Sequence, residues 1–178
     1  MIKLSHCFFK SVLSFAIASG LASTGASADG ESAKSDLARL QEELISTEDP
    51  VVRSFVLSSI EQLAAEGNNK ALIFLGDAFR DGRGVTVDGA RSIAHFKKAA
   101  ENGNALALGR LGDLFREGKV VEASPELAAL YYQRAVESGL ESAKLRLGEA
   151  LVRGLGVKVD TARGMALLRE VSDSGQAA

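Results

Sequence analysis

The chain has 178 residues, which is enough for one modest domain or one short array of repeats. Hydrophobic residues make up 46% of it and aromatic residues only 6%, and this mixture, rich in Ala and Gly and poor in Pro, favours closely packed helices joined by glycine-containing turns. The formal net charge of −2 argues against nucleic acid as a partner, because binding to phosphates needs a basic surface.

The N-terminal segment, residues 1–28, has the pattern of a secretory signal peptide. Two lysines supply its positive region, residues 11–22 form a short apolar stretch, and Ala-Ser-Ala at 26–28 fits the small-residue rule for cleavage. We expect cleavage after Ala28 and a periplasmic or secreted protein. The alternative, an uncleaved membrane anchor, is disfavoured by the shortness of the apolar stretch. The single Cys, Cys7, lies inside this segment, so the mature chain is expected to have no disulfide and no thiolate metal site.

The next segment is predicted to form a helix pair that precedes the repeats. Residues 29–34 are polar, and we expect them to form a disordered tether. Within residues 35–67, leucines 37, 40 and 44 share one helical face, and Asp49-Pro50 marks the start of a second helix. The glycine pattern of the later repeats is missing here, so we interpret residues 35–67 as a degenerate N-terminal capping helix pair. Its second helix is expected to bury Val52, Phe55, Val56, Ile60 and Leu63.

Residues 68–178 contain three copies of a 36-residue repeat. Leu75-Gly76 recurs 36 residues later as Leu111-Gly112 and again as Leu147-Gly148. The same spacing relates Ala71, Ala107 and Ala143; Phe79, Phe115 and Leu151; and the turn glycines Gly82, Gly118 and Gly154. Such a period is typical of architectures whose units stack on one another, and we place the units at about 70–103, 106–139 and 142–175.

Each repeat is predicted to contain two helices. The first helices cover about 70–81, 106–117 and 142–153, and each ends at its turn glycine. The second helices begin near Asp88, Ser124 and Asp160, which are good N-cap residues. Their buried faces are expected to consist of Ile93, Phe96, Ala99 and Ala100 in the first repeat, and of Leu127, Leu130, Tyr131 and Ala135 in the second.

The motif Ala-x3-Leu-Gly-x2-Phe-x2-Gly-x-Gly-Val-x2-Asp, complete from Ala71 to Asp88, resembles the Sel-1-like repeat family, which is related to tetratricopeptide repeats. The motif is followed by Phe96, Ala99-Ala100 and Gly103, as the resemblance requires. The middle repeat departs from it, since Val120 replaces the second glycine and Ser124 replaces the aspartate. The resemblance implies an all-α fold, a right-handed α-solenoid of stacked antiparallel helix pairs.

The resemblance also implies a function as a scaffold. Family members similar to this chain include periplasmic proteins of exopolysaccharide assembly, such as the alginate-secretion scaffold, and a periplasmic regulator of a sensor kinase. It implies a non-enzymatic protein–protein adaptor in the cell envelope, in exopolysaccharide production or its regulation, with another envelope protein as partner. Other members are secreted host-interaction proteins with disulfides between helices, from which the absence of Cys in the mature chain sets this protein apart. The alternative of a module that binds an envelope polysaccharide stays open.

Solenoids bind partners on their concave face, which the first helix of each repeat lines. On that face an acid recurs at one register, with arginines on both sides of it. We predict that the partner is bound by nine residues, called the ladder residues below: Phe74, Asp77, Arg80, Arg110, Asp113, Arg116, Arg146, Glu149 and Arg153. The alternative is a set of ion pairs on solvated helix faces, each adding only about 0.2–0.5 kcal/mol.

The sequence predicts no catalytic, cofactor or metal site. His95 is the only histidine after residue 28, and a single histidine without a nearby Asp, Ser or Cys partner makes a poor base or ligand. The segment 82–85 follows a predicted helix and lacks the Lys-Ser/Thr of a phosphate-binding loop. Tyr131 and Tyr132 are expected to pack between helices. Enzyme activity is therefore not expected.

The last predicted helix, residues 161–174, has no following helix to cover its outer face. A face left open on a stack tends to associate. Either the chain is a fragment of a longer array, or this face docks on a partner or, in self-association, on a second copy of the chain.

Overall fold

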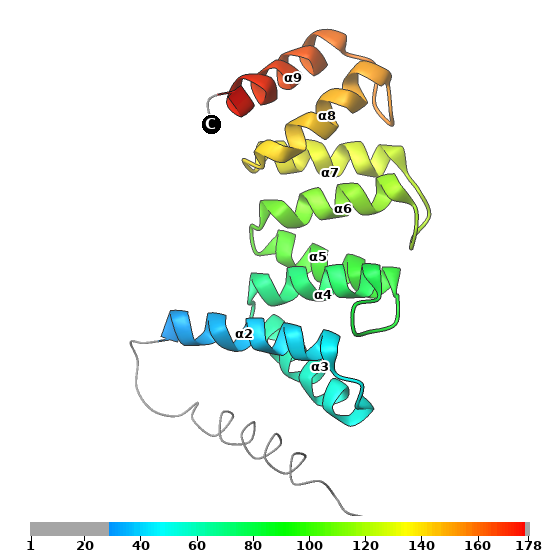
Figure 1. Ribbon diagram of the computed structural model, residues 1–178. Coiled ribbons are helices and arrows are strands. Elements are labelled where there is room, and N and C mark those ends of the chain that lie inside the picture. The colour runs from blue at the N-terminus through cyan, green and yellow to red at the C-terminus, as the bar shows by residue number, and fades with distance from the viewer. Residues whose placement is uncertain (1–28, 177–178) are drawn as a thin grey trace, which may run out of the picture. The chain divides into compact units, whose positions relative to one another are not determined.

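The computed structural model describes residues 29–176, and it describes side chains for residues 36–174. The predicted signal peptide, 1–28, lies outside this range. The described part contains eight helices and no strand, which confirms the all-α prediction (Figure 1). They are α2 (Asp29–Ser46), α3 (Pro50–Ala65), α4 (Asn69–Asp81), α5 (Gly89–Glu101), α6 (Ala105–Glu117), α7 (Pro125–Glu137), α8 (Glu141–Arg153) and α9 (Thr161–Gln176).

One expectation about the N-terminal part is wrong. Residues 29–34, predicted as a disordered tether, form the first turns of α2, which begins at Asp29. Glu, Ala and Lys in this stretch are good helix formers, so the polar composition that suggested a tether is equally compatible with a solvated helix end. Residues from Leu37 onward belong to one compact unit, and all packing described below lies within it.

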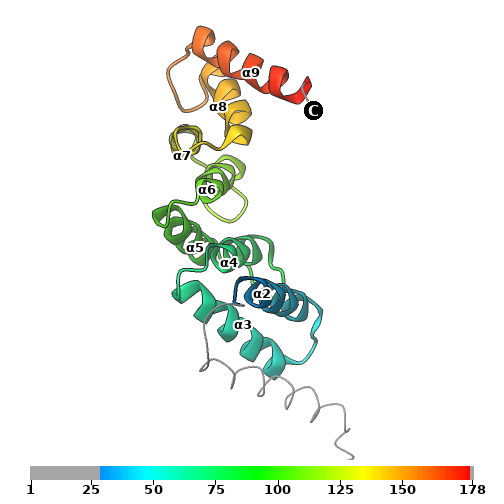
Figure 2. The ribbon, with the colours of Figure 1, turned by 90° about the vertical axis from the view of Figure 1, so that its left-hand side faces the viewer.

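In this unit the helices stack in the order of the chain (Figures 1 and 2). The closest packing joins α4 to α5, α6 to α7, and α8 to α9, which are the two helices of each repeat. Neighbouring repeats meet where α5 packs on α6 and α7 packs on α8, and α3 packs on α4 in front of the first repeat. The result is a helical solenoid. None of the described helices is both long and apolar enough to cross a membrane.

In the repeats, both ends of the first helices and the starts of the second helices fall within about one residue of the predicted positions, because local capping chemistry determines them. Side chains of Asp88 and Ser124 accept hydrogen bonds from backbone amides in the first turns of α5 and α7. The three first helices of the repeats end in glycines with left-handed backbone, at φ values of 73°, 63° and 69° for Gly82, Gly118 and Gly154.

The Leu-Gly pairs are sites of close contact between the two helices of a repeat. Leu75 and Leu111 are fully buried. A Cβ added to Gly76 would lie under 3.0 Å from three atoms of the Phe96 ring. A Cβ added to Gly112 would lie 2.5 Å from the ring of Tyr132. The missing side chain lets the second helix place an aromatic ring directly on the first.

Of the four residues predicted for the buried face of α7, only Ala135 is buried. The buried residues are Ala128, Ala129, Tyr132 and Ala135, whereas Leu130 is 50% exposed and Tyr131 is only half-buried. Leu127 is also exposed. Tyr132 stands 36 residues after Phe96, so the repeat requires Tyr132 on the buried face, and the more apolar leucines then turn outward.

The helix pair in front of the repeats buries a small core of its own. Leu44, Val56 and Ile60 are almost completely buried. Phe55, expected in this core, is exposed instead. The backbone of the first repeat's turn lies directly on this pair, since a Cβ on Gly84 would overlap the carbonyl group of Leu44. This glycine has a φ of 71°, so both its conformation and its close contact favour Gly.

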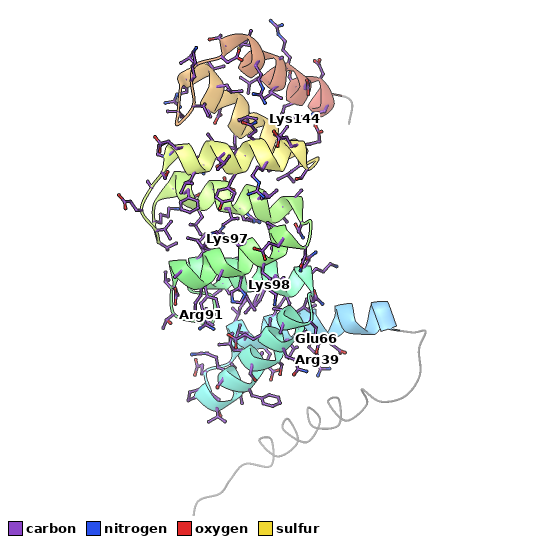
Figure 3. All side chains as sticks on the ribbon, turned by 180° about the vertical axis from the view of Figure 1, so that it is seen from behind. Arg39, Glu66, Arg91, Lys97, Lys98 and Lys144 are labelled. Atoms are coloured by element: carbon purple, nitrogen blue, oxygen red, sulfur yellow. The ribbon has the colours of Figure 1, made fainter. Side chains whose placement is uncertain are left out.

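Packing at the other end of the unit includes an ion pair between helices. Lys144 of α8, labelled in Figure 3, lies 2.9 Å from a carboxylate oxygen of Glu170 in α9 and 2.8 Å from one of Glu141. Leu168 of α9, which stands 36 residues after Tyr132, is the nearest side chain to the position that a Cβ on Gly148 would take. The third repeat therefore keeps the Leu-Gly contact with an aliphatic partner.

Candidate protein-binding groove

The first acid of the ladder, Asp77, is held inside a cluster of arginines. It is only 7% exposed and lies 3.0 Å from Arg80, 3.6 Å from Arg110 and 3.9 Å from Arg83. Burial raises the pKa of Asp77 above its ordinary value, although the three guanidinium groups act in the opposite direction. The contact with Arg110 joins α4 to α6. Asp77 is therefore a structural link between the first two repeats, with little surface left for a partner.

The second acid, Asp113, is bound to a tyrosine of the neighbouring helix. The Tyr132 hydroxyl donates a hydrogen bond of 2.8 Å to Asp113 Oδ1 and accepts one of 3.1 Å from Arg116 Nε. Burial raises the pKa of the Tyr132 hydroxyl, and the hydrogen bond to Asp113 raises it further. The hydroxyl therefore stays protonated and keeps Asp113 and Arg116 in fixed positions.

The third acid, Glu149, is the most accessible of the three. It lies 3.6 Å from Arg146 of the same helix, and both side chains are more than 40% exposed. An ion pair with this exposure contributes little to stability. Arg146 and Glu149 are therefore free to exchange this contact for one with a partner.

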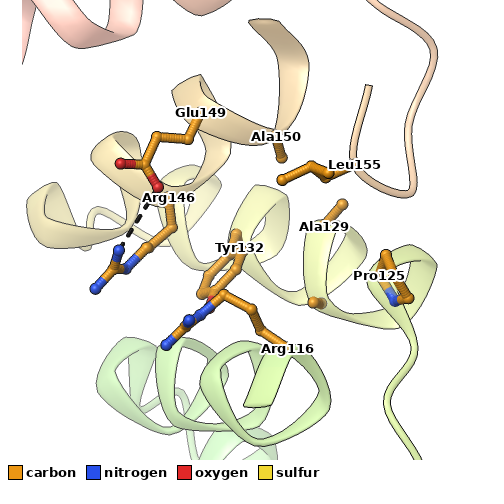
Figure 4. Close-up of a pocket in the computed structure, with 9 residues that line it drawn as sticks. Arg116, Pro125, Ala129, Tyr132, Arg146, Glu149, Ala150 and Leu155 are labelled. Atoms are coloured by element: carbon orange, nitrogen blue, oxygen red, sulfur yellow. Dashed lines mark hydrogen bonds and ion pairs between the residues drawn. The ribbon is translucent and has the colours of Figure 1, made fainter. Parts of the chain in front are cut away.

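Two pockets meet at Tyr132 and together form what we call the α6–α8 groove. The wider pocket, of about 320 Å³, lies between Arg110 and Asp113 of α6 and Arg146 of α8. The second, of about 220 Å³, lies between Arg116 and Glu149. Arg146 and Tyr132 line both. In Figure 4 the side chains of Arg116, Tyr132 and Arg146 come from α6, α7 and α8 to one pocket, with the Arg146–Glu149 ion pair at its side.

Five of the nine ladder residues line this groove: Arg110, Asp113, Arg116, Arg146 and Glu149. Phe74, Asp77, Arg80 and Arg153 line neither pocket. Arg153 stands 36 residues after Glu117, whereas the residue 36 positions after Arg116 is Val152. The arginine register therefore breaks in the third repeat.

The groove also contains residues that the sequence did not identify as binding residues. Tyr132 was expected in the core, but its hydroxyl reaches the groove. Leu106, Leu145 and Leu155 are 43%, 39% and 42% exposed and line its two ends. One signal was available: Leu106, Arg110 and Asp113 stand at i, i+4 and i+7 and therefore share a helical face.

His95 has a packing environment. Its ring stacks on Phe79 with centroids 5.7 Å apart, and Arg91 lies over the same Phe79 ring at 4.0 Å. Tyr131 stacks on Phe115 in the same way, 36 residues later. Burial lowers the pKa of His95, and Arg91 lowers it further, so the imidazole is neutral at pH 7. Within the described part of the chain, no three His, Cys, Asp or Glu side chains are grouped to hold a metal ion.

Comparison with known families identifies the repeats. The model of the Sel1 repeat matches residues 69–104, 105–140 and 142–175, together more than half of the chain. The chain belongs to the Sel1 repeat family. Proteins of this family are generally non-catalytic scaffolds for protein–protein interaction. The search of curated proteins found no significant match.

Three solved structures have the same fold. One is c5321, a protective antigen of uropathogenic Escherichia coli, with a TM-score of 0.67 and 25% identity over 78% of this chain and 30% of that one. Another is a Sel1 repeat protein of Oxalobacter formigenes, with a TM-score of 0.58 and 32% identity; the match covers 67% of this chain and 35% of that one. The third is cysteine rich protein B of Helicobacter pylori, with a TM-score of 0.53 and 20% identity; the match covers 67% of this chain and 88% of that one. The chain thus spans about a third of the length of the first two proteins.

Proposed function

We propose that this protein is a non-enzymatic scaffold of the cell envelope that binds another protein in the α6–α8 groove. The observation that carries this proposal is the groove itself, in which partly exposed charged residues from successive repeats surround one pocket system. Membership of a family of scaffolds supports protein binding in general. The signal-peptide pattern of residues 1–28 supports export to the periplasm or beyond.

We place the scaffold in exopolysaccharide production or its regulation. This part of the proposal rests on the resemblance of the repeats to periplasmic scaffolds with that role. A direct glycan site is less well supported. Such a site depends on exposed aromatic rings, and the aromatic residue that lines the groove, Tyr132, is 3% exposed. The polysaccharide is therefore connected to this chain through a protein partner.

Affinity capture from an envelope extract tests the proposal with a pair of matched variants. The exported protein serves as bait beside Arg146→Glu, which reverses a charge in the groove, and Arg134→Glu, which makes the same change at an exposed position of α7 outside the groove and outside the ladder. We expect one protein to be retained by the unchanged bait and by Arg134→Glu, and lost with Arg146→Glu. The mass of the recovered bait shows whether the chain was cleaved after Ala28.

Two results would contradict the proposal in different ways. If the unchanged bait retains no protein, the scaffold function itself is wrong. If all three baits retain the same protein, scaffolding stands but the groove is not its site. Recovery of a bait that still contains residues 1–28 would contradict cleavage. Absence of the protein from the envelope fraction of the producing cells would contradict export.

A further inference from the structure

We infer that the α6–α8 groove binds an extended segment of the partner protein that carries one carboxylate side chain between two apolar side chains. This inference rests on the proposed function and adds the chemistry of the partner. It depends on three features of the groove: its excess of arginine, its apolar ends and its length.

The middle of the groove has one guanidinium group more than it has carboxylates. Asp113 is already engaged by Arg116 and the Tyr132 hydroxyl, and Glu149 by Arg146. Arg110 is the third arginine, and its partner Asp77 lies outside the groove and is shared with two other arginines. Among the side chains that line the groove, a partner carboxylate therefore meets three guanidinium groups and two carboxylates. Glu117, which lies 3.1 Å from Arg116, is outside the groove.

Arg110 and Arg146 are placed to bind that carboxylate from two sides. They stand 36 residues apart, at the same register of α6 and α8, and both line the wider pocket. A guanidinium group binds a carboxylate through two parallel hydrogen bonds, which favours an acid over a neutral acceptor. The residue at this register in α4 is Phe74, so only the α6–α8 groove has an arginine on each wall among the three repeats.

Both ends of the groove are apolar. Leu106 and Leu145 are exposed at the end formed by the N-terminal halves of α6 and α8. Leu155 is exposed at the opposite end, beside Pro125 and Ala129. Covering an exposed leucine with an apolar side chain removes apolar surface from water and favours binding. The groove thus offers an apolar, a cationic and a second apolar position in a row.

The length of the row fits an extended peptide of about five residues. Leu106 and Arg116 are ten residues apart in α6, which corresponds to about 15 Å at 1.5 Å per residue. In an extended segment alternate side chains point to the same side, and residues i and i+4 are about 13 Å apart. The sequence that fits is therefore apolar-x-acidic-x-apolar, with the acid between Arg110 and Arg146.

Fluorescence anisotropy with labelled synthetic peptides tests the inference on the unchanged protein. The probe is a nine-residue peptide with Leu-Ser-Asp-Ser-Leu at its centre. One control replaces the Asp by Lys, a second replaces both Leu by Ser, and a third replaces the two inner Ser by Pro. We expect the Asp peptide to bind at least about tenfold more tightly than the Lys peptide, with a difference that shrinks as salt is added. The peptide without Leu should also bind more weakly, by about tenfold.

The proline peptide separates an extended occupant from a helical one. Proline restricts the preceding residue to extended backbone and cannot continue a helix, so an extended occupant tolerates it. We expect its affinity to stay within about threefold of the serine peptide. Loss of binding would show that the occupant is helical and would overturn the extended geometry.

Variants of the protein locate the site. Arg146→Glu should weaken binding of the Asp peptide by about tenfold or more, and Arg146→Ala by about threefold, whereas Arg134→Glu, outside the groove and the ladder, should change it by less than about twofold. Circular dichroism melting checks that each variant is folded, and Arg146→Ala carries the test if the glutamate variant is not.

The inference is wrong if the Lys and Asp peptides bind equally, if both arginine reversals have the same effect, or if none of the peptides binds below about 1 mM. These failures are separable from failure of the scaffold proposal. If the unchanged bait captures a protein that Arg146→Glu does not, but none of the synthetic peptides binds, the scaffold proposal is supported and the proposed chemistry of the partner is rejected.

Discussion

At the scale of single residues, the hydroxyl group of Tyr132 connects the core of the second repeat to the groove. Its ring occupies the place of Phe96 in the first repeat and packs on Gly112. Its hydroxyl extends beyond that place and bonds Asp113 and Arg116. The ring is therefore a packing residue, and the hydroxyl positions two charged side chains of the groove.

Replacing Tyr132 by Phe should lower the free energy of unfolding by about 1 kcal/mol, because a partly buried hydrogen bond to a charged acceptor is lost while the ring still fits. Urea denaturation measures the effect. Tyr131→Phe is the matched control, since the described structure records ring stacking on Phe115 but no hydrogen bond from the Tyr131 hydroxyl. It should change the free energy by less than about 0.5 kcal/mol. Equal effects of the two substitutions would show that the hydroxyl of Tyr132 is not held as described.

At the scale of single elements, helix α6 contains two interior glycines with different surroundings. A Cβ on Gly112 would overlap the ring of Tyr132, which is fixed in the core. A Cβ on Gly109 would come within 2.7 Å of one methyl group of Leu140, the flexible end of a half-buried side chain. Glycine in a helix costs up to about 1 kcal/mol relative to alanine, so each substitution has the same gain in helix propensity.

The two alanine substitutions should therefore change the stability of the protein in different directions. Gly112→Ala should destabilise the protein by about 1–3 kcal/mol, because the ring of Tyr132 has to move and the repeat loses a close contact between its helices. Gly109→Ala should be neutral or stabilising by up to about 1 kcal/mol, because Leu140 can turn away. Thermal and urea unfolding of both variants compare them in the same helix. Destabilisation of equal size at both positions would contradict the special role of the Leu-Gly pair.

The sequence predicts features of a helix that depend on neighbouring residues of the chain better than features that depend on packing against another helix. Helix ends were predicted well, because Asp88, Ser124 and the turn glycines act within one turn of the chain. The buried face of α7 was predicted wrongly except at Ala135, because which side of the helix faces the core depends on the neighbouring helix. Leu130 is more apolar than Ala129, yet the register that places Tyr132 on Gly112 turns Leu130 outward.

At the scale of the whole molecule, the ladder pattern predicted part of the groove. The 36-residue period placed Arg110 and Arg146 on the same side of successive repeats, where the groove has them. The period could not reveal that Asp77 is enclosed by three arginines, from α4, from the turn after it and from α6, since the contact with α6 follows from packing between repeats. Nor could it show which exposed leucines border the groove. Whether the ladder residues bind a partner stays a prediction.

The unequal packing of the second helices leads to a prediction about α9. Helix α7 packs on α6 and on α8, whereas the main packing partner of α9 among the described helices is α8. Met165 of α9 is 40% exposed, while Ala129, 36 residues earlier in α7, is buried. In a linear stack each unit is stabilised by its neighbours, so a helix with one neighbour opens more easily than one with two.

Hydrogen exchange followed by mass spectrometry measures this difference. At about 1 µM protein, backbone amides of residues 161–174 should exchange at least about tenfold faster than those of residues 125–137, which serve as the internal control. If the open face of α9 also mediates self-association, raising the protein concentration to about 100 µM should slow exchange in α9 and leave α7 unchanged, because association stabilises only the covered helix. Unchanged exchange at the higher concentration would contradict self-association through α9. Equal protection of α9 and α7 at the lower concentration would contradict the open face itself, because a second neighbour must then cover α9 in the isolated chain.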